Sequence, residues 1–583
     1  MGGRDTRTAG LGDLTRTVGV LFQDPEAQLV MLEVDDEIAF GLENLGIPRH
    51  EMGVRVRAAR ELVGLDAART PRRLDQLSGG TKQRVVLAAL LAMGTAALVL
   101  DEPTANLDPQ GARLVLGVLG RLCEGRERSL LLVEHRLDEV AGLIDRVAVL
   151  DGTGHLALEG PPDAVFGTHA ADLDRLGVWM PQFAALARLF EPAPAALPHT
   201  AAEAADLLVA RWPRAFTVHG SPINAHPAAA SLAPVPPASE LPADLTPGPS
   251  PVGEGERGAP HPRAGVPPSR FGRAGECPPG RRVLAYGGGP GRRGGPHPTT
   301  EGRTAGGGAL LGVRDVIYRY HRADPLAPPA LAHVSLDVRA GEFLALVGPN
   351  AAGKSTLGLL LAGVLRPSTG AVLLDGRDLR RVPEREVRAR LSYVFQYPEH
   401  QFVARTVRDE MLFGLRLRGH PQAAAARRAG EALERFGLAA LAAANPYTLS
   451  HGQKRRLSVA TALVTDPEAI ILDEPTFGQD RRHTDELLAL LGELHRAGRT
   501  VAVITHDLTL VAEHAQRVVA LAGGQVAFDG TPRALFEQPE VLARCGLHLP
   551  PVAEVVRLAR RRRPDLPAAI SLPELRQLLP PAR

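Results

Sequence analysis

Runs of apolar residues along the chain predict buried helices and strands and do not predict membrane spans. The longest run, Val85–Leu100, is shorter than a bilayer requires and carries Gly94 and Thr95 in its middle. It predicts a buried helix followed by a buried strand. The residues after Met1 are rich in Gly, Arg and Thr, without the apolar core of a signal peptide. We therefore expect any membrane role to depend on partner proteins.

One strand, loop and helix pattern carries recognisable chemistry. Glu342–Val347 predicts a short buried strand and Leu357–Val364 an apolar helix, while GPNAAGKST between them matches the P-loop pattern G-x-x-x-x-G-K-[ST]. Backbone N–H groups of such a loop surround a phosphate, a lysine reaches the β- and γ-phosphates, and a serine coordinates Mg²⁺. A chance match in a glycine-rich chain is the alternative. The candidate ATP-binding residues are Gly348, Asn350, Gly353, Lys354, Ser355 and Thr356.

A long internal repeat runs through the chain. Its matched segments, first copy before second, are FQDPEAQ and FQYPEHQ, LSGGTKQR and LSHGQKRR, LVLDEPTANLD and IILDEPTFGQD, and LLVEH and AVITH. Glutamine and serine are 55 residues apart in the first copy (Gln23 to Ser78) and 54 in the second (Gln396 to Ser450). A unit of this length is a repeated domain and not a solenoid repeat.

The P-loop has no counterpart in the first copy. Lys354 precedes Gln396 by 42 residues, and the same offset from Gln23 falls before Met1. We expect the remaining sheet to lack a packing partner. The motif residues left without a phosphate loop are Gln23, Asp101, Glu102 and His135. Two explanations stay open: a start further upstream or a broken reading frame, and a shortened half that only presents its LSGG segment to the intact half.

Composition narrows the class of protein. Of the 583 residues 44% are hydrophobic, which is enough for more than one core. The 67 Lys and Arg residues balance 65 Asp and Glu residues, so the net charge does not point to nucleic acid as the general partner. Three scattered cysteines match no metal-site spacing and suit a reducing cytosol.

The stretch between the two copies, roughly 221–308, is dominated by Pro, Gly, Ala and Arg and predicts a disordered linker. Its arginines could contact anionic lipid or nucleic acid, although a solvated tether is the simpler interpretation. The expected domains are 1–218, a first ATPase domain without its P-loop portion and with a C-terminal tail; 219–308, the linker; 309–545, a complete second domain; and 546–583, a helical tail.

These motifs, in this order, resemble the ATP-binding-cassette (ABC) ATPases, whose signature is LSGGQ and whose hydrolysis motif is an apolar strand that ends in Asp-Glu. The resemblance covers residues 1–218 and 309–583. It implies an α/β fold with two P-loop NTPase domains in tandem, the first without its N-terminal P-loop portion, and an ATPase that uses ATP and Mg²⁺.

The resemblance implies a role for each motif residue of the second copy. The apolar strand Ala469–Leu472 would carry Asp473 to Mg²⁺ and Glu474 to the attacking water, at the sheet edge where α/β proteins bind ligands. His506 would contact the γ-phosphate, and Gln396 would complete the shell of metal and water. Tyr320 matches the position of an adenine-stacking aromatic, with simple packing as the alternative.

In this family the signature acts on the nucleotide of the opposite domain. The residues expected to close the Lys354 site are Ser78, Gly79 and Gly80 of the first copy. That signature has Thr81 where glutamine is usual, a small departure. The second signature keeps Ser450 and Gly452, but His451 replaces its first glycine, which puts close backbone approach in doubt.

The segments F-Q-x-P-x-x-Q and V-x-D-E-x-x-F-G-L in both copies resemble the energy-coupling-factor (ECF) importers of vitamins and of cobalt or nickel. This resemblance implies two membrane partners, a coupling (T) subunit and a substrate-binding (S) subunit, and a peripheral location on the cytoplasmic face of the membrane. The acidic residues that would face the coupling subunit are Asp36, Glu37, Asp409 and Glu410. An ordinary helix start with N-terminal acids is the alternative. The paired arrangement is similar to import ATPases for a thiamine precursor, hydroxymethylpyrimidine.

Two other function classes stay open at this stage. A soluble paired-cassette ATPase of translation or DNA repair would be expected to carry a charged helical linker or zinc-binding insertions, and neither is visible in the sequence. A regulatory cassette protein with one active site or none is the other alternative, because the first P-loop is missing and His451 interrupts the second signature.

Overall fold

The structure is a computed structural model that describes residues 5–68, 70–104, 107, 109–124, 128–134, 137–194, 196–212, 308–320 and 328–579. The predicted linker, 219–308, lies outside these ranges except for Gly308. His135 lies outside them as well.

The first repeat alternates helices with short strands, beginning with a helix. Val85–Leu100 forms the end of α4 followed by β2, as predicted. Its elements are α1 (Leu11–Thr17), β1 (Val18–Leu21), η1 (Pro25–Ala27), α2 (Val34–Asn44), α3 (Arg49–Leu62), η2 (Leu74–Gln76), α4 (Gly79–Met93), β2 (Ala97–Asp101), α5 (Pro109–Glu124), β3 (Ser129–Val133), α6 (Leu137–Val140), η3 (Ala141–Leu143), β4 (Val147–Leu150), β5 (Leu156–Gly160), η4 (Asp163–Thr168), α7 (Ala170–Leu176), α8 (Gln182–Ala187) and α9 (Ala201–Arg211).

From β11 onward the strands of the second repeat follow the same order as those of the first, and additional strands precede them. Its first part holds β6 (Ala309–Tyr318), β7 (Leu331–Arg339), β8 (Phe343–Val347), α10 (Lys354–Leu361), β9 (Thr369–Leu374), β10 (Arg377–Asp378) and α11 (Glu384–Arg390). The remainder holds β11 (Leu391–Val394), η5 (Pro398–His400), α12 (Val407–Leu417), α13 (Gln422–Arg435), η6 (Ala439–Leu441), η7 (Pro446–Thr448), α14 (His451–Leu463), β12 (Ala469–Asp473), α15 (Arg481–Arg496), β13 (Thr500–Ile504), α16 (Leu508–His514), β14 (Arg517–Ala522), β15 (Gln525–Gly530), α17 (Pro532–Phe536), α18 (Pro539–Arg544), α19 (Pro551–Arg562) and α20 (Leu572–Leu578).

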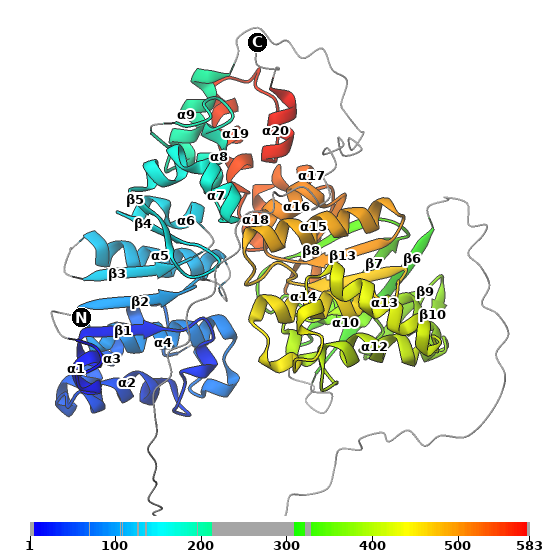
Figure 1. Ribbon diagram of the computed structural model, residues 1–583, viewed down its shortest axis with the longest axis horizontal. Helices are drawn as coiled ribbons and strands as arrows, with labels where there is room; N and C mark the ends of the chain where they lie inside the picture. Colours follow the sequence, from blue (N-terminus) through cyan, green and yellow to red (C-terminus); the bar gives the residue numbers. More distant parts are fainter. Residues whose placement is uncertain are drawn as a thin grey trace, which may run out of the picture. The chain divides into compact units, whose positions relative to one another are not determined.

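Within the main parallel sheet, the described parts of the two repeats differ by one central strand. In the second repeat the sheet order is β11-β12-β13-β8-β14-β15, and β8 pairs in parallel with both β13 and β14. In the described part of the first repeat, β1-β2-β3 forms one parallel sheet and β4-β5 forms a separate hairpin (Figure 1). Removing β8 from the second repeat would leave the same two pieces. The strand that precedes the P-loop is therefore the one that joins the halves of the sheet.

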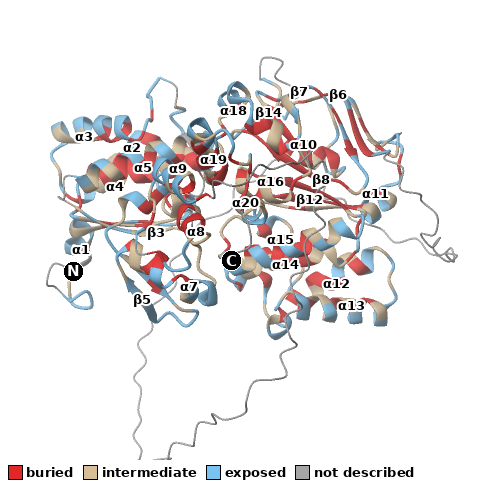
Figure 2. Cartoon of the chain, turned by 90° about the horizontal axis from the view of Figure 1, so that it is seen from above, coloured by how far each residue is buried: buried red, intermediate tan, exposed pale blue. Residues whose placement is uncertain are grey.

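In the described part of the first repeat, apolar side chains of β3 lie in solvent at the edge where β13 meets β8 in the second repeat. Leu131 and Val133 on β3 are 60% and 51% exposed. Their counterparts in the second repeat, Ala502 and Ile504 on β13, are 2% and 0% exposed and belong to the cluster that includes α10 and β6. Figure 2 shows β8 and β12 of the second repeat as buried strands. The expectation that the first sheet would lack a packing partner is met within the described residues.

The C-terminal segments of the two repeats share one hydrophobic cluster. Phe183 and Leu186 of α8, and Leu208 of α9, pack with Val555 and Val556 of α19. The two tails thus form one core and not two independent extensions. Among the described helices, none combines the length and the apolarity needed to cross a bilayer.

The exposed face of β3 predicts that substitutions at matching positions of β3 and β13 lower the stability of the protein by different amounts. Ile504→Ala removes a fully buried side chain and should cost about 3 kcal/mol of stability. Val133→Ala, at the matching position, should cost less than about 1 kcal/mol because half of the side chain is already in water. Calorimetric unfolding of the two variants tests this. Equal losses would mean that the face of β3 is covered in solution.

Candidate functional site

The functional groups of the second repeat gather where its parallel strands end. β8, β12 and β13 are buried along their whole length, and each is followed directly by a motif segment. Because β12 pairs with β13, and β13 with β8, their carboxyl ends lie at the same edge of the sheet. The P-loop, the Asp473-Glu474 pair and His506 are therefore brought together by strand order.

The P-loop requires glycine at two positions because the backbone there is both left-handed and crowded. Gly348 has φ +142°, and a Cβ on it would lie 2.2 Å from the carbonyl oxygen of Leu521. Gly353 has φ +94°, and a Cβ on it would lie 2.5 Å from the carbonyl oxygen of Ala330. No other residue fits this turn without moving the backbone. The loop thus forms a cradle of the kind that surrounds a phosphate.

The helix after the cradle adds to the positive character of the site. α10 begins at Lys354 without a side-chain cap, so that its first N–H groups face the loop. Lys354 is 9% exposed, and its ammonium donates to the carbonyl oxygens of Gly348 (2.8 Å) and Pro349 (3.0 Å). A buried cation beside uncapped N–H groups fits a polyphosphate.

The two carboxylates at the end of β12 are buried and differ in their partners. Burial raises the pKa of Asp473, while a hydrogen bond from Ser355 opposes the rise. Burial would also raise the pKa of Glu474, but contact with His506 and the charge of Lys354 outweigh it, so the pKa of Glu474 lies below its usual range. His506 Nδ1 lies 2.8 Å from Glu474 Oε1. Glu474 is therefore an ionised acceptor oriented by an imidazole.

Glu474 sits in a strained backbone conformation that the first repeat reproduces. Its φ is +46°, and that of Glu102, the matching residue, is +47°. The amide of each glutamate donates to the last part of the next strand, at Ile504 and Val133 respectively, at 2.9 Å. The carbonyl oxygens accept from Arg455 in the second repeat and from Gln83 in the first. Such strain persists only where the surroundings fix it, and it is typical of functional sites.

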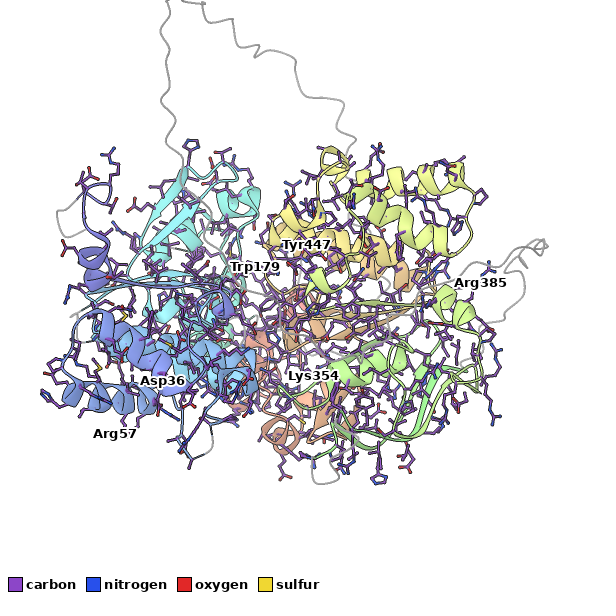
Figure 3. All side chains as sticks on the ribbon, turned by 90° about the horizontal axis from the view of Figure 1, so that it is seen from below. Asp36, Arg57, Trp179, Lys354, Arg385 and Tyr447 are labelled. Carbon is purple, nitrogen blue, oxygen red and sulfur yellow. The ribbon has the colours of Figure 1, made fainter. Side chains whose placement is uncertain are left out.

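A cavity of about 280 Å³ lies over these groups. The predicted site residues that line it are Asn350, Gly353, Lys354, Ser355, Thr356, Gln396, Asp473, Glu474, His506, Ser78, Gly79 and Gly80. Lys354 is labelled in Figure 3. Ser78, Gly79 and Gly80 belong to the first repeat, and all the others belong to the second. One cavity thus holds the P-loop, the candidate catalytic carboxylate Glu474 and a signature segment.

Several predicted residues do not line this cavity. They are Tyr320, Gly348, Ser450, Gly452, Gln23, Asp101 and Glu102. Tyr320 is 58% exposed, and its hydroxyl lies 3.0 Å from the Thr356 hydroxyl. Gly348 contributes through its carbonyl oxygen beneath Lys354. In the first repeat the Gln23 amide donates to the Glu102 carboxylate at 3.0 Å.

The signature serines begin helices α4 and α14. Ser450 forms a full capping box, since its hydroxyl accepts from the Gln453 amide and its amide donates to the Gln453 side chain. In the first repeat Thr81 replaces glutamine, and its hydroxyl lies 2.9 Å from that of Ser78. The departure at Thr81 therefore changes the cap but keeps a partner for the serine.

The histidine in the second signature packs against its own repeat. A Cβ on Gly478 would lie 3.0 Å from the His451 ring, and the ring meets Phe477 edge to face with centroids 6.4 Å apart. Burial lowers the pKa of His451, so the imidazole is neutral near pH 7. The side chain that replaces the signature glycine is accommodated because position 478 is itself a glycine.

The acidic residues assigned to partner docking divide into two kinds. Glu37 and Glu410 are 6% and 4% exposed, and each Oε2 accepts from two successive amides of the loop after the motif glutamine, Val30 and Met31 or Val403 and Ala404, at 2.7 to 2.9 Å. Their carboxylates are thus engaged inside the protein and hold that loop in place. Asp36, labelled in Figure 3, is exposed, and Asp409 accepts from the Thr406 hydroxyl at 2.8 Å.

The structure also adds residues that sequence reasoning missed. The Tyr393 hydroxyl donates to Asp473 at 2.9 Å, and the Thr505 hydroxyl donates to Glu474 at 3.3 Å. Tyr397 and Phe477 line the cavity. For Tyr393 the available signal was its place three residues before Gln396, on the strand that neighbours β12. Nothing in the sequence marks its hydroxyl as a partner of Asp473.

Comparisons with known proteins identify the family to which this chain belongs. The ABC transporter family matches residues 1–105 and 331–477. A protein of Methanosarcina acetivorans named "Putative ABC transporter ATP-binding protein" is 34% identical over 99% of this chain and 82% of its own length. The "Putative HMP/thiamine import ATP-binding protein YkoD" of Bacillus subtilis is 35% identical over 90% of this chain and 78% of its own. The solved structure of cbiO1 from Clostridium perfringens, described as part of the ABC transporter complex cbiONQ, is 31% identical, covers 44% of this chain and 99% of its own, and has a TM-score of 0.36.

The fold and the cavity define a P-loop ATPase built from two repeats. The chain belongs to the ABC transporter ATP-binding proteins. It is an ATP-hydrolysing enzyme of that family, and the predicted fold class, two P-loop NTPase cassettes in one chain, is confirmed.

The internal position of Glu410 predicts a local loss of order on its removal. Glu410→Ala leaves two loop amides without their charged acceptor and should cost about 2 kcal/mol. Hydrogen exchange at the amides of Val403 and Ala404 should speed up. Asp36→Ala, which removes an exposed carboxylate, is the control and should change neither stability nor exchange. Unchanged protection at both amides would contradict the structural role of Glu410.

Proposed function

We propose that this chain is the ATPase subunit of an ECF-type importer, which couples closure on Mg-ATP to uptake of a vitamin or its precursor, or of a metal ion, through separate T and S membrane subunits. The observation that carries the proposal is a link, present in both repeats, between the loop after the motif glutamine and the signature helix. The proposed location is the cytoplasmic face of the membrane, reached through these partners.

The cavity supports ATP hydrolysis by residues in distinct roles. Lys354 and the loop amides would bind the β- and γ-phosphates, and Glu474, ionised and held by His506, would polarise the attacking water. His506 and Gln396 line the same cavity and would contact the γ-phosphate and the water. Ser78 and Gly80 would bind the γ-phosphate from the opposite repeat, and closure around the nucleotide would exclude water and strengthen each hydrogen bond.

The donor set fits Mg²⁺. Asp473 supplies a carboxylate, Ser355 a hydroxyl and Gln396 an amide oxygen, and oxygen is the ligand that this ion prefers. When bound, the ion would neutralise charge on the phosphate oxygens. Ser355 already donates to Asp473, so the two candidate ligands are adjacent.

Two matching ion pairs join the glutamine loop to the signature helix. Glu26 on η1 pairs with Lys82 of α4 at 2.6 Å, and Glu399 on η5 pairs with Lys454 of α14 at 2.9 Å. The lysine side chains are 15% and 17% exposed, whereas those of Glu26 and Glu399 are 66% and 33% exposed. Solvent therefore screens the first pair more than the second. A displacement of the loop would therefore move the helix whose N-terminus carries the signature.

The same loop offers an apolar surface for a membrane partner. Val30 and Leu32 of the first repeat are 65% and 71% exposed, and Val403, which corresponds to Val30, is 64% exposed. Glu37 and Glu410 fix these loops from inside, so the apolar side chains are presented on a rigid base. Asp36 and Asp409 stay beside them as acidic positions for basic side chains of the partner. A short helix with apolar and basic residues fits this surface.

The transported substrate is inferred from likeness alone. The relative from Bacillus subtilis is named for HMP/thiamine import and aligns over most of both chains. This supports a thiamine precursor as the first substrate to test. No residue of an ATPase subunit contacts the cargo, so uptake assays with the S subunit have to decide it.

The proposed chemistry predicts different outcomes for the two matching glutamates. Glu474→Gln should lower ATP turnover at least about a hundredfold while ATP binding is retained, because only the ionised carboxylate polarises water. Glu102→Gln, at the matching position outside the cavity, should retain turnover. Phosphate release and equilibrium binding measure the two effects. Turnover that survives Glu474→Gln would overturn the assignment.

The ion pair between Glu399 and Lys454 predicts that stimulation by the membrane subunits can be lost while ATP turnover itself is kept. Glu399→Gln should preserve ATP turnover of the isolated chain but abolish its stimulation when the chain is reconstituted with T and S subunits in vesicles. The control is Glu431→Gln, which removes a surface i,i+4 pair with Arg427 on α13. Equal stimulation of Glu399→Gln and wild type would contradict the proposed path from the loop to the signature.

A further inference from the structure

The Asp473 carboxylate has a second hydroxyl partner, which comes from β11, the strand just before Gln396. Tyr393 lies on β11, which runs parallel to β12, and it is in register with Ile471, two residues before Asp473. Its hydroxyl donates to Asp473 Oδ2 at 2.9 Å. Asp473 is 4% exposed and Tyr393 is half-buried, so this bond is partly shielded from solvent at the edge of the cavity.

The tyrosine ring is held in place from two sides. A Cβ on Gly358 of α10 would lie 3.1 Å from the ring, so the helix approaches it as closely as a glycine allows. Phe395 packs against the ring edge to face, with centroids 5.0 Å apart. Packing of the ring therefore fixes the position of the Tyr393 hydroxyl.

Two hydroxyl groups therefore hold the Asp473 carboxylate in one orientation. Ser355 reaches Asp473 from the P-loop and Tyr393 reaches it from β11. An ionised carboxylate has about four acceptor positions, so the remaining ones stay available to a cation or its water. Partners of this kind orient metal ligands and tune their affinity.

The first repeat has no tyrosine at the position that corresponds to Tyr393. Val20 occupies the position that corresponds to Tyr393 and has no hydroxyl. Burial and the neighbouring Glu102 raise the pKa of Asp101, and no tyrosine bond opposes them. The tyrosine hydroxyl is thus found in the repeat whose described residues include the P-loop.

We propose that Tyr393 is a positioning residue that sets the metal affinity of the ATP site by fixing the Asp473 carboxylate. This inference rests on the Mg²⁺ site of the proposed function. One determinant of metal affinity would then lie on β11, outside the P-loop and outside the set of residues that bind the metal directly.

The test uses the full chain with a non-hydrolysable ATP analogue and Mn²⁺ as the spectroscopic probe. Tyr393→Phe removes one oxygen and keeps the ring. Its Mn²⁺ affinity, titrated by electron paramagnetic resonance, should fall roughly tenfold. Affinity for the analogue in the presence of a chelator should stay unchanged. The Mg²⁺ concentration for half-maximal ATP turnover should rise by a similar factor.

The control is Tyr447→Phe, which loses a hydroxyl bond to the Phe402 carbonyl away from the cavity and should keep wild-type metal affinity. Equal Mn²⁺ affinity in Tyr393→Phe and wild type would overturn the inference. A parallel loss of metal and of metal-free nucleotide binding would also overturn it, because it would show a merely structural role. Failure of the wild type to bind Mn²⁺ with nucleotide would instead reject the metal site itself.

Discussion

The pairing of β8 between β13 and β14 is the constraint on which the second repeat depends. This pairing joins six strands into one sheet. It also brings the P-loop to the edge of the sheet where Asp473 and Glu474 lie, and it places β13 between two neighbouring strands. Where the first repeat has no described counterpart of this strand, the sheet divides into two pieces and Leu131 becomes exposed. One backbone segment thus supplies the phosphate cradle and the continuity of the core.

Both repeats nevertheless keep the same local architecture around their hydrolysis motifs. Glu102 and Glu474 share a left-handed backbone, and in each case a buried side chain of the signature helix donates to the glutamate carbonyl. That side chain is Gln83 in one repeat and Arg455 in the other. Because the helix contacts the strained residue directly, signature and catalytic strand form one unit within each repeat. The cavity that holds Lys354 is lined by Asp473 and Glu474 of the second repeat and not by Asp101 or Glu102 of the first.

Buried charge supports the surface that we propose for the membrane partner, on the loops that follow Gln23 and Gln396. Glu37 and Glu410 lie inside, where each satisfies two loop amides that would otherwise be costly to bury. The loop then presents Val30 or Val403 to solvent and connects through Glu26 or Glu399 to the signature helix. Rigid presentation and a direct ion pair together make this loop suited to transmit a displacement.

The sequence by itself determined the repeat, the P-loop, the strands that carry it and the set of residues that converge at one edge. These features follow from local patterns: apolar runs fix buried strands, glycines fix the turn, and parallel strand order brings motif ends together. Only the tertiary structure decided that Glu410 binds loop amides, that Tyr320 does not line the cavity and that Tyr393 holds Asp473. The last of these contacts joins residues 80 positions apart. Such pairings depend on how side chains of separate strands and helices meet in the packed core, and spacing along the chain does not encode that.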